Sequence, residues 1–258
     1  MNTMDPDSGL DEHADMDMAH ATGLAHRASP SHAIARMAET SPLPSAQLER
    51  RRLIHRDESV RRQSDAFREI RTRLLGLVDG QNFVTLLVAV SPRSGSSFVA
   101  RNLAAAFAFD EAKTSLLIDC NLRYPGQHKA LGVDPVAGGL IDFLEAPERG
   151  IRGMIYPTGI PRMRLIPAGK ARENGAEYFS SSPMRAALDS LRGRYPDRYI
   201  FLDGPAIAGS PDARILSDLA DFVVVVAGYG RDTPKAISQA TANFDPDKLA
   251  GVVFNHAP

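Results

Sequence analysis

The chain has 258 residues, which is enough for one large domain or two small ones. It carries 30 Lys and Arg against 31 Asp and Glu, so its overall charge gives no bias toward nucleic acid or an anionic membrane. A single cysteine, Cys120, excludes an internal disulfide bond and fits a reducing compartment. No apolar run approaches the ~18 residues of a membrane-spanning helix, and the N-terminus is acidic rather than basic and then apolar. We therefore expect a cytoplasmic protein without a signal peptide.

The first 66 residues contain no Phe, Tyr or Trp. Because such a segment buries too little apolar surface to offset its ordering entropy, we predict a disordered tail over residues 1–50. Four histidines in it could suggest a metal site: His13, His20, His26 and His32. Their spacing gives no i, i+4 pair and no cysteine accompanies them, which favours a solvated tail over a metal site.

An Arg-rich segment follows over residues 51–82. Eight Arg fall between positions 51 and 73, and apolar residues recur among them at helical spacing. The apolar positions are Phe67, Ile70, Leu74, Leu77 and Val78. The pattern predicts an amphipathic helix over 61–78, packed on the main domain through this stripe. Its arginines form either a solvated face or a subunit contact.

The chain is organised around residues 83–109. The apolar run 83–90 has the length and composition of a strand buried on both faces, and 91–97 is a tight turn of Pro, Ser and Gly. The helical pattern that follows could be capped by Ser96 or Ser97. This is the strand–loop–helix unit that places a phosphate at a helix N-terminus.

Strand and helix patterns alternate after this unit. We predict strands at 113–119, 164–167, 199–203, 221–227 and 251–255, and helices at 138–144, 182–194, 211–219 and 234–243. Nearly continuous apolar strands that alternate with helices indicate an α/β fold, a doubly wound and mostly parallel sheet flanked by helices, over residues 83–258. In such folds, ligands bind outside the carboxyl ends of the strands.

The central loop departs from the phosphate-binding pattern G-x-x-x-x-G-K-[ST]. When the pattern is aligned on Gly95, Val90 stands in place of the first Gly and Ser96 in place of the Lys. Ser97 falls where a hydroxyl would hold Mg²⁺. The loop therefore keeps the backbone frame of a phosphate site and lacks its cation.

Three loops together resemble those of one protein family: SPRSGSS (91–97), LLIDCNLRYP (116–125) and YIFLDGPAI (199–207). The family is the bacterial tyrosine autokinases (BY-kinases) of capsule and exopolysaccharide export, related to the MinD/ParA group of deviant P-loop ATPases. Further likenesses lie at 139–144, 166–181, 211–221 and 251–255. The resemblance implies a P-loop NTPase-like fold in which the three loops are the Walker A loop, a second Asp-rich Walker motif and the Walker B strand.

The resemblance also implies the site residues. It assigns ATP or ADP binding to Ser94, Gly95, Ser96 and Ser97 of the Walker A loop and to Arg123, and Arg93 is a further candidate because it lies within that loop. Mg²⁺ would be held by Ser97, Asp119 and Asp203, the two aspartates being the catalytic carboxylates. A purely structural role for both aspartates, as caps at strand ends, remains the alternative.

Several positions depart from the family pattern. Ser96 replaces the Lys, Asn121 the second Asp of the second Walker motif, and Ala206 the second Pro of the Walker B motif. A tyrosine cluster after the last strand, the family's usual autophosphorylation target, is absent from this sequence. One lost charge-assisted hydrogen bond costs about 1.5–3 kcal/mol, and phosphoryl transfer depends on placed positive charge. Together the changes predict a pseudokinase, in which binding of ATP, ADP and Mg²⁺ is weak or absent.

Two alternatives stay open at this point. In one, Arg93 replaces the missing cation and the protein is an active ATP-dependent tyrosine autokinase. In the other, it is a ParA/MinD-like positioning ATPase, which the lack of a basic C-terminal surface helix or an amphipathic membrane tail disfavours.

The resemblance finally implies partners. Asp65, Arg68 and Arg71 have the spacing of the family's E-x-x-R-x-x-R motif of self-association, with Asp in place of Glu. We therefore expect a homo-oligomer and, as partner, a membrane chain-length or co-polymerase protein of polysaccharide export that would bring the chain to the inner membrane. No nucleic-acid partner is expected.

Overall fold

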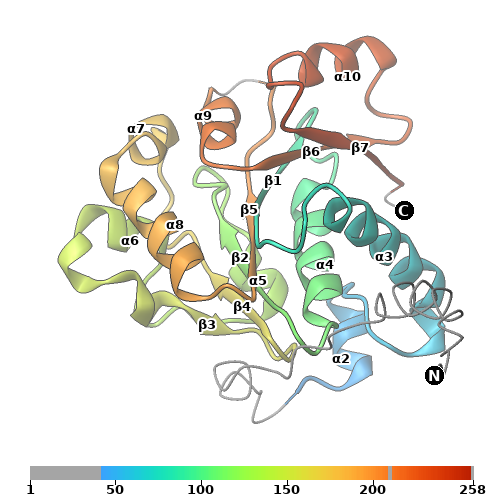
Figure 1. Cartoon of the computed structure of the whole chain (residues 1–258), viewed down its shortest axis with the longest axis horizontal. Helices are drawn as coiled ribbons and strands as arrows, with labels where there is room; N and C mark the ends of the chain where they lie inside the picture. Colours follow the sequence, from blue (N-terminus) through green and yellow to red (C-terminus); the bar gives the residue numbers. More distant parts are fainter. Residues whose placement is uncertain (1–41, 209–210, 257–258) are drawn as a thin grey trace, which may run out of the picture.

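The computed structural model describes residues 42–208 and 211–256, and within them a seven-stranded sheet forms the centre of the molecule (Figure 1). The strand order is β3-β4-β2-β5-β1-β6-β7. All neighbouring strands are parallel except β3 and β4, which are antiparallel. The bounds are β1 Val84–Ala89, β2 Thr114–Asp119, β3 Tyr156–Pro157, β4 Met163–Ile166, β5 Arg198–Asp203, β6 Phe222–Gly228 and β7 Leu249–Asn255. The predicted doubly wound α/β fold is confirmed.

Helices cover both faces of this sheet (Figure 1). The face of α3 and α4 has one apolar cluster, which includes Leu87 and Phe107, and the opposite face has another, which includes Leu86 and Leu216. Consecutive residues of β1 point to opposite faces, which is why a near-continuous apolar run fits a strand buried on both sides. The longer helices are α3 Arg61–Leu75, α4 Ser96–Ala108, α8 Ser182–Arg194, α9 Asp212–Asp218 and α10 Pro234–Thr241, and the shorter ones are α2 Ser45–Arg50, α5 Gln127–Leu131, α6 Leu140–Glu145 and α7 Gly175–Phe179.

The segment before β1 differs from the sequence expectation in two places. Residues 45–50, expected to lie in the disordered tail, form helix α2, and Leu53 and Ile54 are fully buried against α4. The stripe on α3 also ends earlier than expected, because the helix stops at Leu75 and Leu77 remains half exposed. The Arg-rich segment is therefore part of the folded domain. Residues 1–41, with the four tail histidines, lie outside the described residues.

Besides α2, two short helices and one short strand were not predicted: α5, α7 and the two-residue β3. They are too short to show an apolar period in the sequence, and tertiary contacts hold them in place. Cys120 is buried directly after β2 and forms no disulfide bond. Among the described residues, no helix is both long and apolar enough to span a bilayer.

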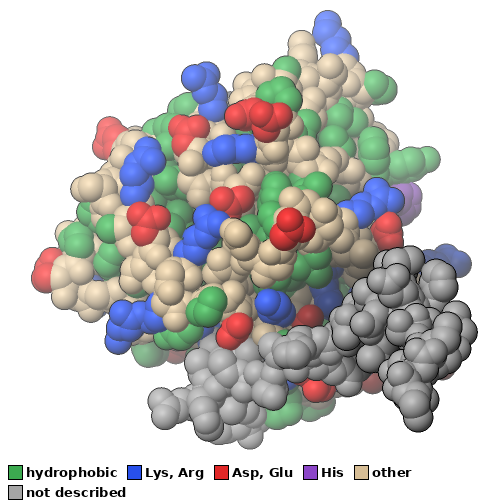
Figure 2. Space-filling model, viewed as in Figure 1, with side chains coloured by type: hydrophobic (Ala, Val, Ile, Leu, Met, Phe, Trp, Pro, Cys, Tyr) green, Lys and Arg blue, Asp and Glu red, His purple; other side chains and the backbone are tan. Residues whose placement is uncertain are grey.

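Basic and acidic side chains alternate over the face of the molecule shown in Figure 2. This mixture agrees with the near balance of 30 basic and 31 acidic residues in the sequence. Neither sign dominates this face.

Candidate functional site

The loop between β1 and α4 has the backbone of a phosphate-binding turn. Gly95 precedes the first turn of α4 with φ +95°, and Arg93 also adopts a positive φ of +71°. The side-chain amide of Asn255, at the end of β7, donates to the carbonyl oxygen of Ser94 at 3.1 Å. A Cβ atom at position 95 would lie 2.1 Å from Nδ2 of Asn255, so only glycine fits there. Gly95 is therefore the N-cap, and the expected capping by Ser96 or Ser97 is wrong, since both lie inside the helix.

A carboxylate fastens this loop to the end of β6. Asp232 accepts hydrogen bonds from the Ser91 hydroxyl at 2.5 Å, the Ser94 hydroxyl at 2.6 Å and the Gly228 amide at 2.7 Å. Partial burial alone would raise the pKa of Asp232, but the bonds from Ser91, Ser94 and Gly228 outweigh it and lower that pKa. Sequence reasoning missed Asp232, because nothing in its local pattern tells that it folds back on a loop 138 residues away.

Asp119 and Asp203 both lie at the carboxyl ends of their strands, as predicted, and the structure shows that they are direct neighbours on β2 and β5. Both are buried, with 0% and 1% of their surface exposed. The Asp119 carboxylate accepts three backbone N–H groups, from Asn121 at 3.2 Å and from Gly126 and Gln127 at 3.0 Å each. Burial raises the pKa of Asp119, and these bonds oppose the rise. Asp119 thus organises the turn that follows β2, in the manner of a structural cap.

Asp203 has fewer partners. Gln127 Nε2 donates to its Oδ2 at 2.7 Å, and the nearby Ser97 side chain acts to lower its pKa. Its Oδ1 has no hydrogen-bond partner among the described residues. Burial, and then the neighbouring charge of Asp119, raise the pKa of Asp203 to about 7. Two carboxylates so close cannot both ionise readily, so a proton or a cation is required there.

Gln127 is the residue that joins these parts. It is the first residue of α5, 1% exposed, and its Nε2 also donates to the carbonyl oxygen of Ser97 at 2.9 Å. In the sequence, the one feature that marks Gln127 is its place just after the Pro125–Gly126 turn, and this does not indicate which groups it contacts.

A cleft of about 630 Å³ lies over the loop. Its lining includes Arg93, Gly95, Ser96, Ser97, Asn121, Arg123, Tyr124, Ala206 and Asp212. Of the predicted nucleotide-binding residues, only Ser94 is missing from this wall, since its hydroxyl turns to Asp232. Asp119 and Asp203 do not line the cleft either and lie in the core next to it.

The two arginines of the cleft differ. Arg123 Nε lies 2.9 Å from Oε2 of Glu173, so its charge is already compensated. Arg93 forms no ion pair within the described residues. Arg93 is therefore the cation that could face an anion in the cleft.

The oxygen donors fit a Mg²⁺ ion only in part. The orphaned Oδ1 of Asp203 and the Ser97 hydroxyl are hard oxygen ligands of the kind that Mg²⁺ takes. The oxygens of Asp119 are occupied by N–H donors. Among the described residues, no group of three or more His, Cys, Asp or Glu could hold a metal ion. A bound Mg²⁺ would therefore need further oxygens, from phosphate or water.

The three predicted oligomerisation residues do not behave alike. Asp65 and Arg68 are exposed on α3 and pair with each other at 2.8 Å. Arg71 points to the domain instead, where Nη1 donates to the carbonyl oxygen of Ala106 at 3.1 Å and Nη2 lies 3.5 Å from Asp110. Arg71 thus helps hold α3 on α4.

Known proteins are similar to this chain in sequence and in fold. Tyrosine-protein kinase wzc of Salmonella typhimurium is 34% identical over 194 residues, which cover 74% of this chain and 26% of that protein. The homologues of this chain are bacterial tyrosine-protein kinases. Another is tyrosine-protein kinase YwqD of Bacillus subtilis, 29% identical over 80% of this chain and 86% of its own. The chain spans about a quarter of the length of the first curated relatives it matches.

Solved structures agree with this relationship. The VpsO kinase domain superposes with a TM-score of 0.67 and 26% identity, over 78% of this chain and 98% of that one. The ParA-family ATPase from Chlorobium tepidum shares the fold more distantly, with a TM-score of 0.54 and 17% identity over 68% of this chain and 75% of its own. No family model matches the sequence. The predicted resemblance to tyrosine autokinases is confirmed, with the ParA-like ATPases as more distant neighbours of the fold.

Proposed function

We propose that this chain is a catalytically degenerate relative of the bacterial tyrosine kinases that binds nucleotide weakly or not at all. The observation that carries the proposal is Ser96, which begins α4 and lines the cleft where the P-loop pattern has its Lys. The loop backbone still forms the turn, so the shape of a phosphate site persists without its charge. A missing preorganised donor at such a place costs on the order of 10²–10³ in rate.

The surroundings of Ser96 support this reading. Arg123 is engaged by Glu173, and the carboxylate of Asp232 lies behind the loop and holds its serines. Asn121 presents no carboxylate to a metal ion. Each of these arrangements lowers the attraction of the cleft for a nucleotide with Mg²⁺.

A relative supports a role in polysaccharide export. The succinoglycan biosynthesis transport protein ExoP of Rhizobium meliloti is 28% identical over 69% of this chain and 23% of its own length. By analogy, the chain would act in the cytoplasm at the inner membrane, as the partner of a membrane chain-length or co-polymerase protein in exopolysaccharide synthesis and export. The exposed Asp65–Arg68 pair on α3 would then contribute to a contact between copies of the chain.

Arg93 supports one alternative. Its side chain lines the cleft and has no ion-pair partner within the described residues, so it could supply the cation of an active ATP-dependent tyrosine kinase. In that case Arg93→Ala would abolish nucleotide binding. In a catalytically degenerate protein, Arg93→Ala would change the affinity for nucleotide little.

Calorimetric titration of the full chain with MgADP and MgATP, and labelling with radioactive ATP, test the proposal. We expect dissociation constants in the millimolar range or no measurable heat, and no phosphotyrosine. Rapid autophosphorylation that disappears in Asp203→Asn would overturn it. The matched control is Asp189→Asn, which changes an exposed carboxylate on α8.

A further inference from the structure

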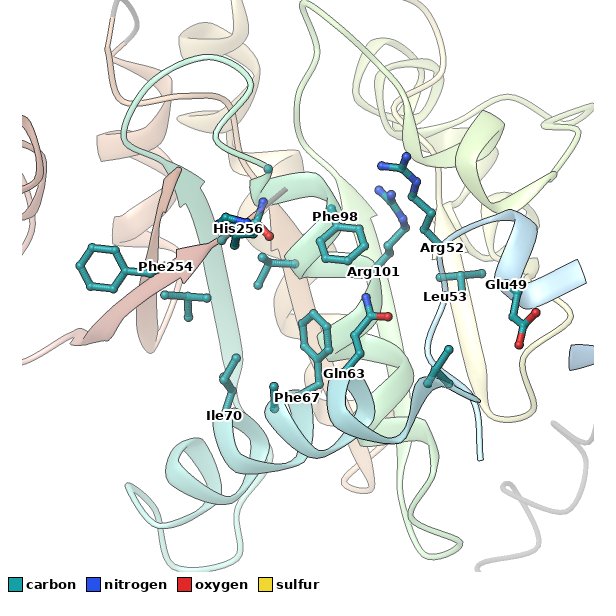
Figure 3. A pocket seen from close by; sticks show the side chains of 16 residues that line it. Glu49, Arg52, Leu53, Gln63, Phe67, Ile70, Phe98, Arg101, Phe254 and His256 are labelled. Carbon is teal, nitrogen blue, oxygen red and sulfur yellow. The ribbon is translucent and has the colours of Figure 1, made fainter. Parts of the chain in front are cut away.

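A second cavity of about 630 Å³ shares Gly95 with the cleft and is otherwise lined by different residues (Figure 3). α3, α4, the segment after α2 and the end of β7 surround it. Apolar side chains form much of its wall, among them Leu53, Phe67, Ile70, Phe98 and Val99. None of the nucleotide-site predictions uses these side chains.

Two arginines line one end of this cavity. Figure 3 shows the guanidinium groups of Arg52 and Arg101 next to each other, beyond the ring of Phe98. Neither side chain forms an ion pair with another described residue, and Nε of Arg101 is buried without a hydrogen-bond partner among them. Glu49 is the acidic residue of the wall. Its Oε1 accepts a hydrogen bond from the Ser59 hydroxyl at 2.7 Å and lies 3.4 Å from Nε2 of His55. Neither contact involves an arginine of the cavity.

Burial lowers the pKa of the Arg101 guanidinium. The carboxylate of Asp203 acts to raise that pKa, and the positive charge of Arg52 lowers it further. An arginine nonetheless keeps its proton in proteins, so the cavity holds two positive charges that repel each other. An anion between them would remove that repulsion and satisfy the unpaired donor.

The fold holds this pair in place. Asn102, completely buried in α4, donates to the backbone carbonyl of Arg52 at 3.1 Å and accepts from the amide of Ile54 at 2.8 Å. Arg52 has a φ of +54°, an unusual conformation for a residue with a side chain. The guanidinium carbon of Arg101 lies 5.2 Å from the centre of the Phe98 ring, which limits its movement. Asn102 thus fixes the backbone at Arg52, whose side chain is exposed, while the ring of Phe98 packs beside the more buried Arg101.

We propose that this cavity binds the phosphotyrosyl side chain of a partner protein. The aromatic walls of Phe67 and Phe98, whose ring centres are 6.1 Å apart, would contact the tyrosine ring, and the two arginines would bind its phosphate. Arg pairs bind phosphate bidentately, which gives both charge and geometry. A chain without strong kinase chemistry would in this way recognise the product of an active tyrosine kinase.

The spacing favours this ligand over a nucleotide. Because Arg101 lies 5.2 Å from the Phe98 ring centre, the anion and the aromatic group of one ligand must be adjacent. In phosphotyrosine the phosphate is attached to the ring, whereas a ribose separates base and phosphate in a nucleotide. The inference is independent of nucleotide binding in the cleft, since Arg52 and Arg101 do not line the cleft.

Titration of the isotope-labelled full chain with N-acetyl-phosphotyrosine amide, followed by NMR, tests the proposal. We expect saturable shifts that include the Nε–H signal of Arg101. N-acetyl-tyrosine amide, the phosphoserine analogue and inorganic phosphate should each bind at least tenfold more weakly, because each lacks either the phosphate or the ring. Equal affinity for the unphosphorylated compound, or no binding, would overturn the proposal.

Variants locate the ligand. Arg52→Gln changes an exposed side chain and should keep the fold, and both Arg52→Gln and Arg101→Gln should weaken binding about tenfold or more. The matched control is Arg62→Gln, an exposed arginine of α3 that does not line the cavity. Arg93→Ala in the cleft should have no effect. Competition by MgATP, together with loss of binding in Arg93→Ala, would place the ligand in the cleft and contradict the proposal.

Discussion

The side-chain nitrogen of Gln127 lies 2.7 Å from Oδ2 of Asp203 and 2.9 Å from the carbonyl oxygen of Ser97. One amide group thus joins α5, the end of β5 and the first turn of α4. The Gln127 amide gives the Asp203 carboxylate a neutral hydrogen-bond donor, not a full positive charge. This neutral compensation is consistent with a carboxylate pair that shares a proton in the absence of a bound cation.

Asp203 should make stability depend on pH. Its pKa is raised from 3.8 to about 7, so the folded state takes up a proton between these values, and stability falls as pH rises through that window. Asp203→Asn removes this effect and should stabilise the protein at pH 8 by a few kcal/mol, at about 1.4 kcal/mol per pKa unit. Urea unfolding at pH 5, 6, 7 and 8 measures it. Parallel pH profiles of the wild type and the variant would contradict the argument, and Asp189→Asn serves as the exposed control.

Restoring the missing cation should restore nucleotide affinity. Ser96→Lys places an ammonium group at the start of α4, beside the cleft, and one charged hydrogen bond contributes about 1.5–3 kcal/mol. We expect MgADP to bind roughly tenfold to 150-fold more tightly, as measured by calorimetry. Ser96→Gln has a similar length without the charge and should stay close to the wild type. If both variants bind MgADP equally, the missing Lys is not what limits affinity.

Asp232 should stabilise the loop between β1 and α4. Asp232→Ala leaves the hydroxyls of Ser91 and Ser94 and the amide of Gly228 without their acceptor, which should cost about 1–3 kcal/mol. Hydrogen exchange should accelerate at the Gly228 amide. Asp189→Ala, on the exposed face of α8, should change neither measurement. Unchanged exchange at Gly228 in Asp232→Ala would mean that the loop does not depend on this carboxylate.

Asn102 should couple the Arg-rich segment to the domain. Asn102→Ala leaves the buried amide of Ile54 unpaired, so unfolding should require about 1–3 kcal/mol less free energy. Chemical denaturation measures the loss. Asn243→Ala, which removes an exposed amide at the end of α10, should have a much smaller effect. Comparable losses in both variants would show that the segment does not rely on Asn102.

The sequence by itself determined the alternation of strands and helices, and the edge of the sheet where the polar loops with Asp119 and Asp203 gather. These features follow from apolar periodicity and from the rule that parallel strands end at one edge, both of which are local. The sequence also showed that Ser96 stands where a Lys is expected, since that comparison needs only the order of residues.

Only the tertiary structure decided which groups meet across long stretches of chain. Asp232 reaches Ser94, Gln127 reaches Asp203 and Asn102 reaches Ile54, each through contacts between residues at least 48 positions apart. It also showed that Arg71 packs inward and that Arg52 and Arg101 converge on one cavity. The physical reason is that side-chain partners and burial depend on how layers pack, and no local pattern of residues encodes that packing.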